Sequence, residues 1–180
     1  MTENTRWAIK LNRVMFSELE KVDITLERRE HNLDGVQFER AMIRRFPKLR
    51  AIPQPVPLQL QSYFSRGRSG HIEPIVDGYF NNRGSKFLVE IKKGFHYRAG
   101  MPCIATSREQ LQVLTSGTTR DGGNGVKYDP GEYWIFQPHR MSSSRTRTVK
   151  YTLYRALPGL VRFMNRNQGT LGVNVTSGRL

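Results

Sequence analysis

Two strand-like runs and the turn between them decide the expected fold: Ile75-Val76-Asp77-Gly78-Tyr79-Phe80, Asn81-Asn82-Arg83-Gly84-Ser85, and Lys86-Phe87-Leu88-Val89-Glu90-Ile91-Lys92. Apolar, aromatic and β-branched residues dominate both outer runs, and the middle segment is rich in residues that favour tight turns. The stretch therefore predicts a β-hairpin with Arg83-Gly84 at its tip.

That turn pairs Asp77 with Glu90, and Phe80 with Phe87. Alternation then sorts the side chains by face, because successive residues of a strand point to opposite sides. One face carries Val76, Gly78, Phe80, Phe87, Val89 and Ile91, and the other carries Ile75, Asp77, Tyr79, Leu88, Glu90 and Lys92. A register shifted by one residue would separate the two carboxylates. We therefore expect one core face and one face with three charged residues.

Asp77, Glu90 and Lys92 suggest a specific chemistry. Two converging carboxylates repel each other unless a cation lies between them, and oxygen ligands suit Mg²⁺ or Mn²⁺. A neighbouring lysine can orient a water molecule and offset the negative charge of a phosphoryl transition state. The alternative interpretation is a salt-bridge ladder on a half-exposed sheet.

With this motif the chain resembles the PD-(D/E)xK nuclease superfamily over about residues 33–137. The layout is most similar to TnsA-type transposase endonucleases and very-short-patch-repair-like nucleases: a helix with Glu39, a strand with Gln54-Pro55-Val56, then the hairpin. The family's Pro-Asp dipeptide is replaced here by Pro74-Ile75-Val76-Asp77, and the chain has no room for a long C-terminal recognition domain. The resemblance implies metal-dependent hydrolysis of nucleic acid in a restriction-endonuclease-like fold.

A second candidate carboxylate, Glu39, lies in an expected amphipathic helix over residues 36–46, which Pro47 ends. It shares a stripe with Val36 and Ile43, so we expect it to point inward. In the implied site, Asp77, Glu90, the Ile91 carbonyl and Glu39 hold Mg²⁺ or Mn²⁺, and Lys92 positions the water. The alternative for Glu39 is an exposed ion pair with a neighbouring arginine.

The chain is strongly basic, with a net charge of +14 and a pI near 10.5. Such a protein attracts polyanions, and a phosphate backbone is the expected partner. The residues expected to contact nucleic acid are Arg66, Arg68, Lys93, Arg98, Arg140, Arg145, Arg147 and Lys150. The alternative is a solvated basic face around ordinary core aromatics.

The remaining patterns predict one α/β domain: a central mixed sheet of four to five strands flanked by helices. We expect a lead-in at residues 1–32, the nuclease-like domain at 33–166 and a loosely ordered tail at 167–180. A helix capped by Ser107 or Thr106 should follow, and residues 132–136 should form a buried strand. The resemblance to the PD-(D/E)xK superfamily implies that Gln110 of this helix supplies a polar contact in the site. Cys103 is the sole cysteine, which excludes an internal disulfide.

These observations together predict a Mg²⁺-dependent endodeoxyribonuclease; DNA is preferred to RNA by analogy with the superfamily. Transposition, junction cleavage or a phage-type role are all open, and the enzyme would act as a homodimer or with a partner subunit. No apolar span or signal peptide is evident, so we expect an intracellular, cytoplasmic and soluble protein without a membrane partner. Two alternatives stay open: a non-catalytic nucleic-acid-binding or packaging protein, and a nuclease subunit active only with a recognition partner.

Overall fold

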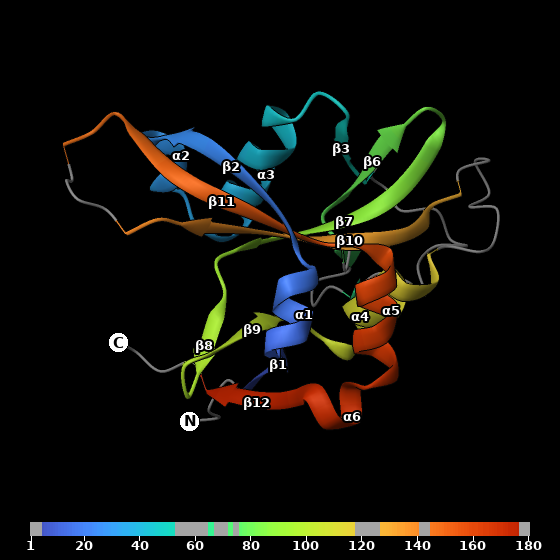
Figure 1. Cartoon of the computed structure of the whole chain (residues 1–180). Coiled ribbons are helices and arrows are strands. Elements are labelled where there is room, and N and C mark those ends of the chain that lie inside the picture. Colours follow the sequence, from blue (N-terminus) through green and yellow to red (C-terminus); the bar gives the residue numbers. More distant parts are fainter. Residues whose placement is uncertain are drawn as a thin grey trace.

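The structure, a computed structural model, describes residues 5–52, 65–66, 72–73, 76–117, 127–140 and 145–176 (Figure 1). In chain order the elements are β1 (Thr5–Lys10), α1 (Arg13–Glu18), β2 (Glu20–Glu27), α2 (Arg28–His31), α3 (Gly35–Arg45), β3 (Leu49–Ala51), β4 (Ser65–Arg66), β5 (Ile72–Glu73), β6 (Gly78–Asn82), β7 (Ser85–Lys93), β8 (His96–Arg98), β9 (Met101–Ala105), α4 (Arg108–Ser116), β10 (Asp129–Pro138), β11 (Thr148–Ala156), α5 (Pro158–Arg166), α6 (Gln168–Leu171) and β12 (Gly172–Thr176).

The main sheet has six strands in the order β2-β11-β10-β7-β6-β3. Strands β7 and β10 are parallel, and the other neighbouring pairs are antiparallel. The chain returns from β7 to β10 through β8, β9 and α4, as a parallel connection requires a long crossover. The α/β class is confirmed, and the expected strand number of four to five is too low for this sheet.

A second sheet has the order β12-β1-β9-β8 and is antiparallel throughout, and β4 pairs with β5 in a separate two-stranded ladder. The segments expected to be a lead-in and a loose tail meet here, because β1 pairs with β12. Residues 168–176 thus form α6 and an edge strand. Likewise, β2 is an edge strand of the main sheet.

Helices cover both faces of the main sheet (Figure 1). On one face, Phe38 and Met42 of α3 pack among the aromatic and aliphatic residues of β7, β10 and β11. On the other, α1, α4 and α5 pack against β7 and β10, together with Ile9 of β1 and Ile104 of β9. Strand β7 therefore lies between two hydrophobic cores, which explains why it is apolar along most of its length.

The expectation of a single core face on the hairpin was therefore wrong. Phe80 and Phe87 join the core under α3, as alternation predicts, but Tyr79 and Leu88 belong to a second core on the face that also carries the charges. Val76 packs with this second group, because the alternation does not continue past the start of β6. None of the helices in the described part of the chain combines the length and apolar character needed to cross a bilayer.

Candidate active site

The β6–β7 hairpin has the predicted register. Gly78 lies opposite Val89, and Phe80 lies opposite Phe87. The tip is Arg83-Gly84, with φ values of 50° and 87°. Two consecutive residues with positive φ are the geometry of a two-residue turn that matches the twist of the flanking strands. The turn therefore fixes the register that brings Asp77 to Glu90.

Backbone pairing between β6 and β7 ends at Gly78, and beyond it the Asp77 side chain accepts the next hydrogen bond from β7. The Ile91 backbone N–H donates to Asp77 Oδ2 at 2.8 Å. The Asp77 backbone N–H donates to Glu90 Oε2 at 3.1 Å. Because the N–H and C=O of one strand residue point to the same edge, the Ile91 carbonyl also points to the side of Asp77. Both carboxylates and this carbonyl thus meet where the two strands separate.

Glu39 completes a carboxylate cluster, which we define as Glu39, Asp77 and Glu90. A hydrogen bond joins the side chains of Glu39 and Asp77, and it raises the pKa of Glu39 while it lowers that of Asp77. Glu39 is therefore the donor in this hydrogen bond and Asp77 the acceptor. The reason for expecting Glu39 here was partly wrong: Val36 is 57% exposed, and the buried stripe of α3 consists of Phe38, Ala41 and Met42.

Burial dominates the electrostatics of the carboxylate cluster. It raises the pKa of Glu39 from 4.5 to about 8, and the hydrogen bond to Asp77 adds to this effect. The pKa of Asp77 rises from 3.8 to about 8, first by burial and then by the negative charge of Glu90. Burial also raises the pKa of Glu90, whose residue is only 3% exposed. The site thus concentrates acidic groups that cannot all ionise without an added cation.

Lys92 is the cation that the chain itself supplies. Its Nζ lies 3.3 Å from Glu90 Oε1 and donates to Gln110 Oε1, also at 3.3 Å. Gln110 in turn donates from Nε2 to Glu90 Oε1 at 3.4 Å. One ammonium group faces three carboxyl groups, so the fully ionised site would carry excess negative charge.

Helix α4 holds Gln110 in place. Ser107 caps the helix, as predicted, with its Oγ accepting from the Gln110 backbone N–H at 3.0 Å. Thr106 Oγ1 donates to Gln110 Oε1 at 3.1 Å and pairs with the buried Tyr133 hydroxyl at 2.6 Å. Thr106 was expected only as a possible helix cap, and Tyr133 was not expected in the site because it lies in an apolar run. Tyr133 could have been identified only from the strand pairing, because it lies beside Glu90 in the β7–β10 ladder.

The donor set fits a hard divalent cation in its chemistry, since it consists of carboxylates and the Ile91 carbonyl. Within the described residues, however, no three His, Cys, Asp or Glu side chains lie in the arrangement of a formed metal site. Glu39 and Asp77 are instead joined to each other by a hydrogen bond that requires a proton. A cation would have to displace that proton.

The residues expected to bind nucleic acid are not all equivalent. Lys93 is used internally: its ammonium donates to the carbonyls of His31 and Leu33 and to Asp34. Arg98 is exposed on β8 and bonds to the Asn174 carbonyl at 3.2 Å. Arg68 lies outside the described residues, and so does the predicted Gln54-Pro55-Val56 strand. Arg66 lies in β4, where only the backbone is described.

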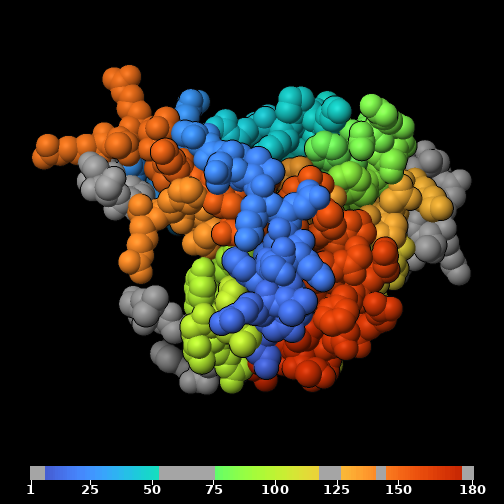
Figure 2. Space-filling model, viewed as in Figure 1, coloured from blue at the N-terminus to red at the C-terminus, as the bar shows by residue number. Residues whose placement is uncertain are grey.

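The other four basic residues are exposed at one end of the β10–β11 hairpin. We call this segment the basic arm and define it by Arg140, Arg145, Arg147 and Lys150. The orange side chains of this region project from one end of the molecule in Figure 2. The arm is thus placed to contact an extended partner.

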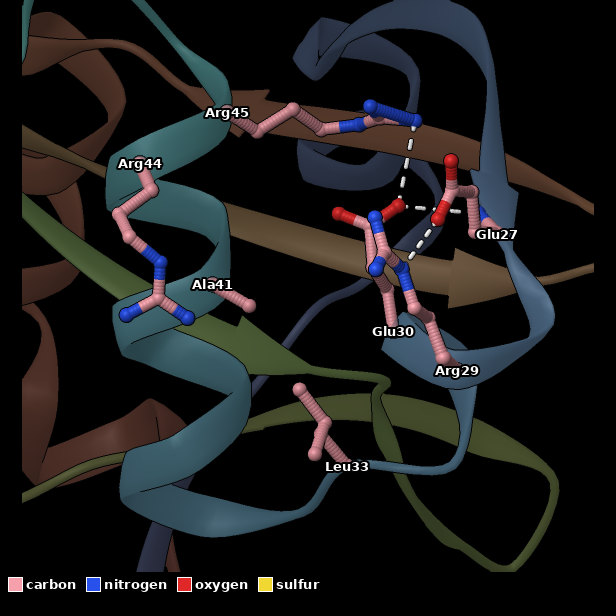
Figure 3. Close-up of a pocket in the computed structure, with 7 residues that line it drawn as sticks. All are labelled: Glu27, Arg29, Glu30, Leu33, Ala41, Arg44 and Arg45. Carbon is pink, nitrogen blue, oxygen red and sulfur yellow. Dashed lines mark hydrogen bonds and ion pairs between the residues drawn. The ribbon is translucent and has the colours of Figure 1, made fainter.

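A pocket of about 500 Å³ lies beside α2 and α3 (Figure 3). Its lining consists of Glu27, Arg29, Glu30, Leu33, Ala41, Arg44 and Arg45. Ion pairs within this set join Arg29 to Glu27 and Arg45 to Glu30. It contains no member of the carboxylate cluster, so the pocket and the candidate active site are separate features.

Comparison with known proteins gave no matching family model, no matching curated protein and no matching solved structure. Any assignment of function therefore rests on the residues and geometry of this chain.

Proposed function

We propose that this chain is a Mg²⁺- or Mn²⁺-dependent endonuclease that hydrolyses phosphodiester bonds in DNA, with the restriction-endonuclease-like organisation of the PD-(D/E)xK superfamily. The observation that carries the proposal is the buried carboxylate cluster beside Lys92 in a chain of net charge +14. Polyanion binding alone would not require buried acids, because they repel phosphate unless a cation reverses the local charge.

Each residue has a defined task in this proposal. Asp77, Glu90, the Ile91 carbonyl and deprotonated Glu39 would hold the cation, which supplies Lewis acidity to the phosphodiester. Lys92 orients the attacking water and offsets the charge that develops on the phosphate oxygens. Gln110 keeps the Lys92 ammonium next to Glu90. Basic residues of the arm hold the DNA backbone and set its position relative to the scissile bond.

The competing function is a nucleic-acid-binding or packaging protein without catalysis. One observation favours it: Asp77 and Glu90 each accept a backbone N–H bond at the end of the hairpin, which is a sufficient structural role. In that case DNA binding would be the same in a chelator as in Mg²⁺, and the carboxylates would matter only for folding.

The test is cleavage of supercoiled, linear and four-way-junction DNA in Mg²⁺, Mn²⁺ or a chelator. Asp77→Asn and Glu90→Gln preserve shape and remove charge, so both should fold, bind DNA and fail to cut. Metal-independent binding with no cutting on any substrate would favour the packaging role. Cutting both strands of a duplex needs two active sites, so we propose that the chain acts as a homodimer or with a partner subunit. We also propose that it acts inside the cell, where DNA is found. If the isolated chain does not cut, adding a recognition partner tests whether it is one subunit of a larger enzyme.

A further inference from the structure

Three aromatic rings form a cluster on the face of the main sheet that also carries Lys92. Phe16 of α1, Phe95 after β7 and Tyr154 of β11 contact one another, with ring centroids 5.1–5.7 Å apart. All three are half-buried. The Lys21 ammonium lies 5.1 Å from the Phe16 centroid and 5.8 Å from that of Tyr154. The three rings are thus partly exposed, with a positive charge beside two of them.

The strand register fixes this cluster relative to the candidate active site. Lys92 lies beside Ile135, Ile135 beside Tyr154, and Tyr154 beside Lys21, in one row across four strands. Neighbouring strands are about 4.8 Å apart, so the Tyr154 backbone is roughly 10 Å from that of Lys92. This distance corresponds to about three nucleotides of a stacked strand at 3.4 Å per phosphate.

Backbone hydrogen bonds to β10 fix the position of Phe95. It comes three residues after Lys92, and its backbone N–H donates to Gln137 Oε1 at 2.9 Å. The preceding Gly94 N–H donates to the Phe136 carbonyl at 2.8 Å. Movement of Phe95 relative to Lys92 would therefore break these two hydrogen bonds to β10.

A fourth ring, Tyr97, is exposed to solvent. Tyr97 is 61% exposed, on the β8–β9 hairpin whose turn is Ala99-Gly100 with positive φ at both residues. Its hydroxyl lies close enough to Tyr154 to contribute to the raised pKa of that residue, after burial. In Figure 2 the yellow-green β8–β9 segment and the blue α1 segment lie side by side on one face.

We propose that these four residues, Phe16, Phe95, Tyr97 and Tyr154, form an aromatic platform that stacks unpaired bases of the strand leading into the active site. This inference rests on the proposed function and names its substrate class: DNA with a single-stranded tail, gap, flap or opened junction. Protein rings can stack on base faces only where the bases have left the duplex stack, and such stacking tolerates any sequence. Lys21 and Arg98 supply positive charge for the phosphates between the stacked bases.

Binding in a chelator tests the inference independently of catalysis. The probes are a blunt duplex and the same duplex with a single-stranded tail that carries 2-aminopurine, whose fluorescence falls on stacking. The intact chain should bind the tailed duplex about tenfold more tightly and quench the probe. Tyr97→Ala should bind the tailed duplex about tenfold more weakly and quench the probe much less. Its affinity for the blunt duplex should equal that of the intact chain.

Met101→Ala is the matched control, because Met101 lies on the same hairpin and is 38% exposed. It should change neither affinity nor quenching. Equal affinity of the intact chain for the two duplexes would overturn the inference, and so would a Tyr97→Ala loss that is the same for both. Selective binding of the tailed duplex without cleavage in Mg²⁺ would support the platform while it contradicts the proposed hydrolysis.

Discussion

The Ile91 backbone N–H donates to Asp77 Oδ2 at 2.8 Å, at the point where β6 separates from β7. A side-chain carboxylate thus continues the strand ladder for one residue and is held against Glu90. The Asp77 backbone N–H also donates to Glu90 Oε2 at 3.1 Å, so the two hydrogen bonds together anchor the hairpin and set the spacing of two acidic groups. Structural and proposed catalytic roles therefore overlap at Asp77, and experiments must separate them with substitutions that keep the shape of the side chain.

Cation binding should release protons. Burial raises the pKa values of Glu39 and Asp77 to about 8, so at neutral pH the cluster holds protons that a divalent cation must displace. Affinity for Mn²⁺ should rise with pH until about pH 8 and then level off. Calorimetric titration in buffers of different ionisation enthalpy counts the released protons. Glu39→Gln should release fewer, and a proton count of zero at pH 7 would contradict the shared-proton arrangement.

The stability of the metal-free protein should fall as pH rises. In the unfolded chain Asp77 and Glu39 lose their protons near their ordinary pKa values of 3.8 and 4.5, whereas the folded chain keeps them to about 8. The folded state therefore binds more protons across this window, and the free energy of unfolding decreases with pH. Asp77→Asn should flatten that decrease in chelator. Denaturant curves at pH 5 and pH 8.5 measure it, and parallel curves for the two proteins would refute the prediction.

Gln110 should matter for catalysis and not for DNA binding. It bonds to both Lys92 and Glu90, so Gln110→Ala frees the ammonium to move. We expect about a tenfold loss of cleavage rate, the scale of one hydrogen bond that orients a reacting group. Gln112→Ala, on the exposed face of the same helix, is the control and should cleave normally. Equal rates for the two variants would remove Gln110 from the site.

The basic arm should contribute electrostatic affinity. Replacing both Arg145 and Arg147 by alanine should weaken DNA binding and reduce the slope of log K against log salt by about 2, if each guanidinium neutralises one phosphate. Arg162 and Arg166, on α5, give a double-alanine control with the same change of net charge. If both double variants show the same salt slope, binding depends on net charge alone and the arm has no particular role.

Local sequence signals predicted the hairpin that brings Asp77 to Glu90 and the start of α4. The turn at Arg83-Gly84 and strand alternation gave the hairpin register, and Ser107 gave the start of α4, because both depend on neighbours in sequence. The pairing of β1 with β12 was not predictable in this way, since it joins the two ends of the chain. The buried stripe of α3 also escaped prediction. In the folded protein Phe38 is buried and Val36 is exposed, and the Glu39 side chain still contacts Asp77.

Lys92→Ala tests whether the chain is a metal-dependent nuclease, with Lys86→Ala, on the same strand, as its control. Purified proteins are compared for cleavage of supercoiled DNA in Mn²⁺ and in chelator, and for DNA affinity in chelator. We predict metal-dependent cleavage by the intact chain and by Lys86→Ala, no cleavage by Lys92→Ala, and similar DNA affinity for all three proteins. Full cleavage by Lys92→Ala would contradict the account.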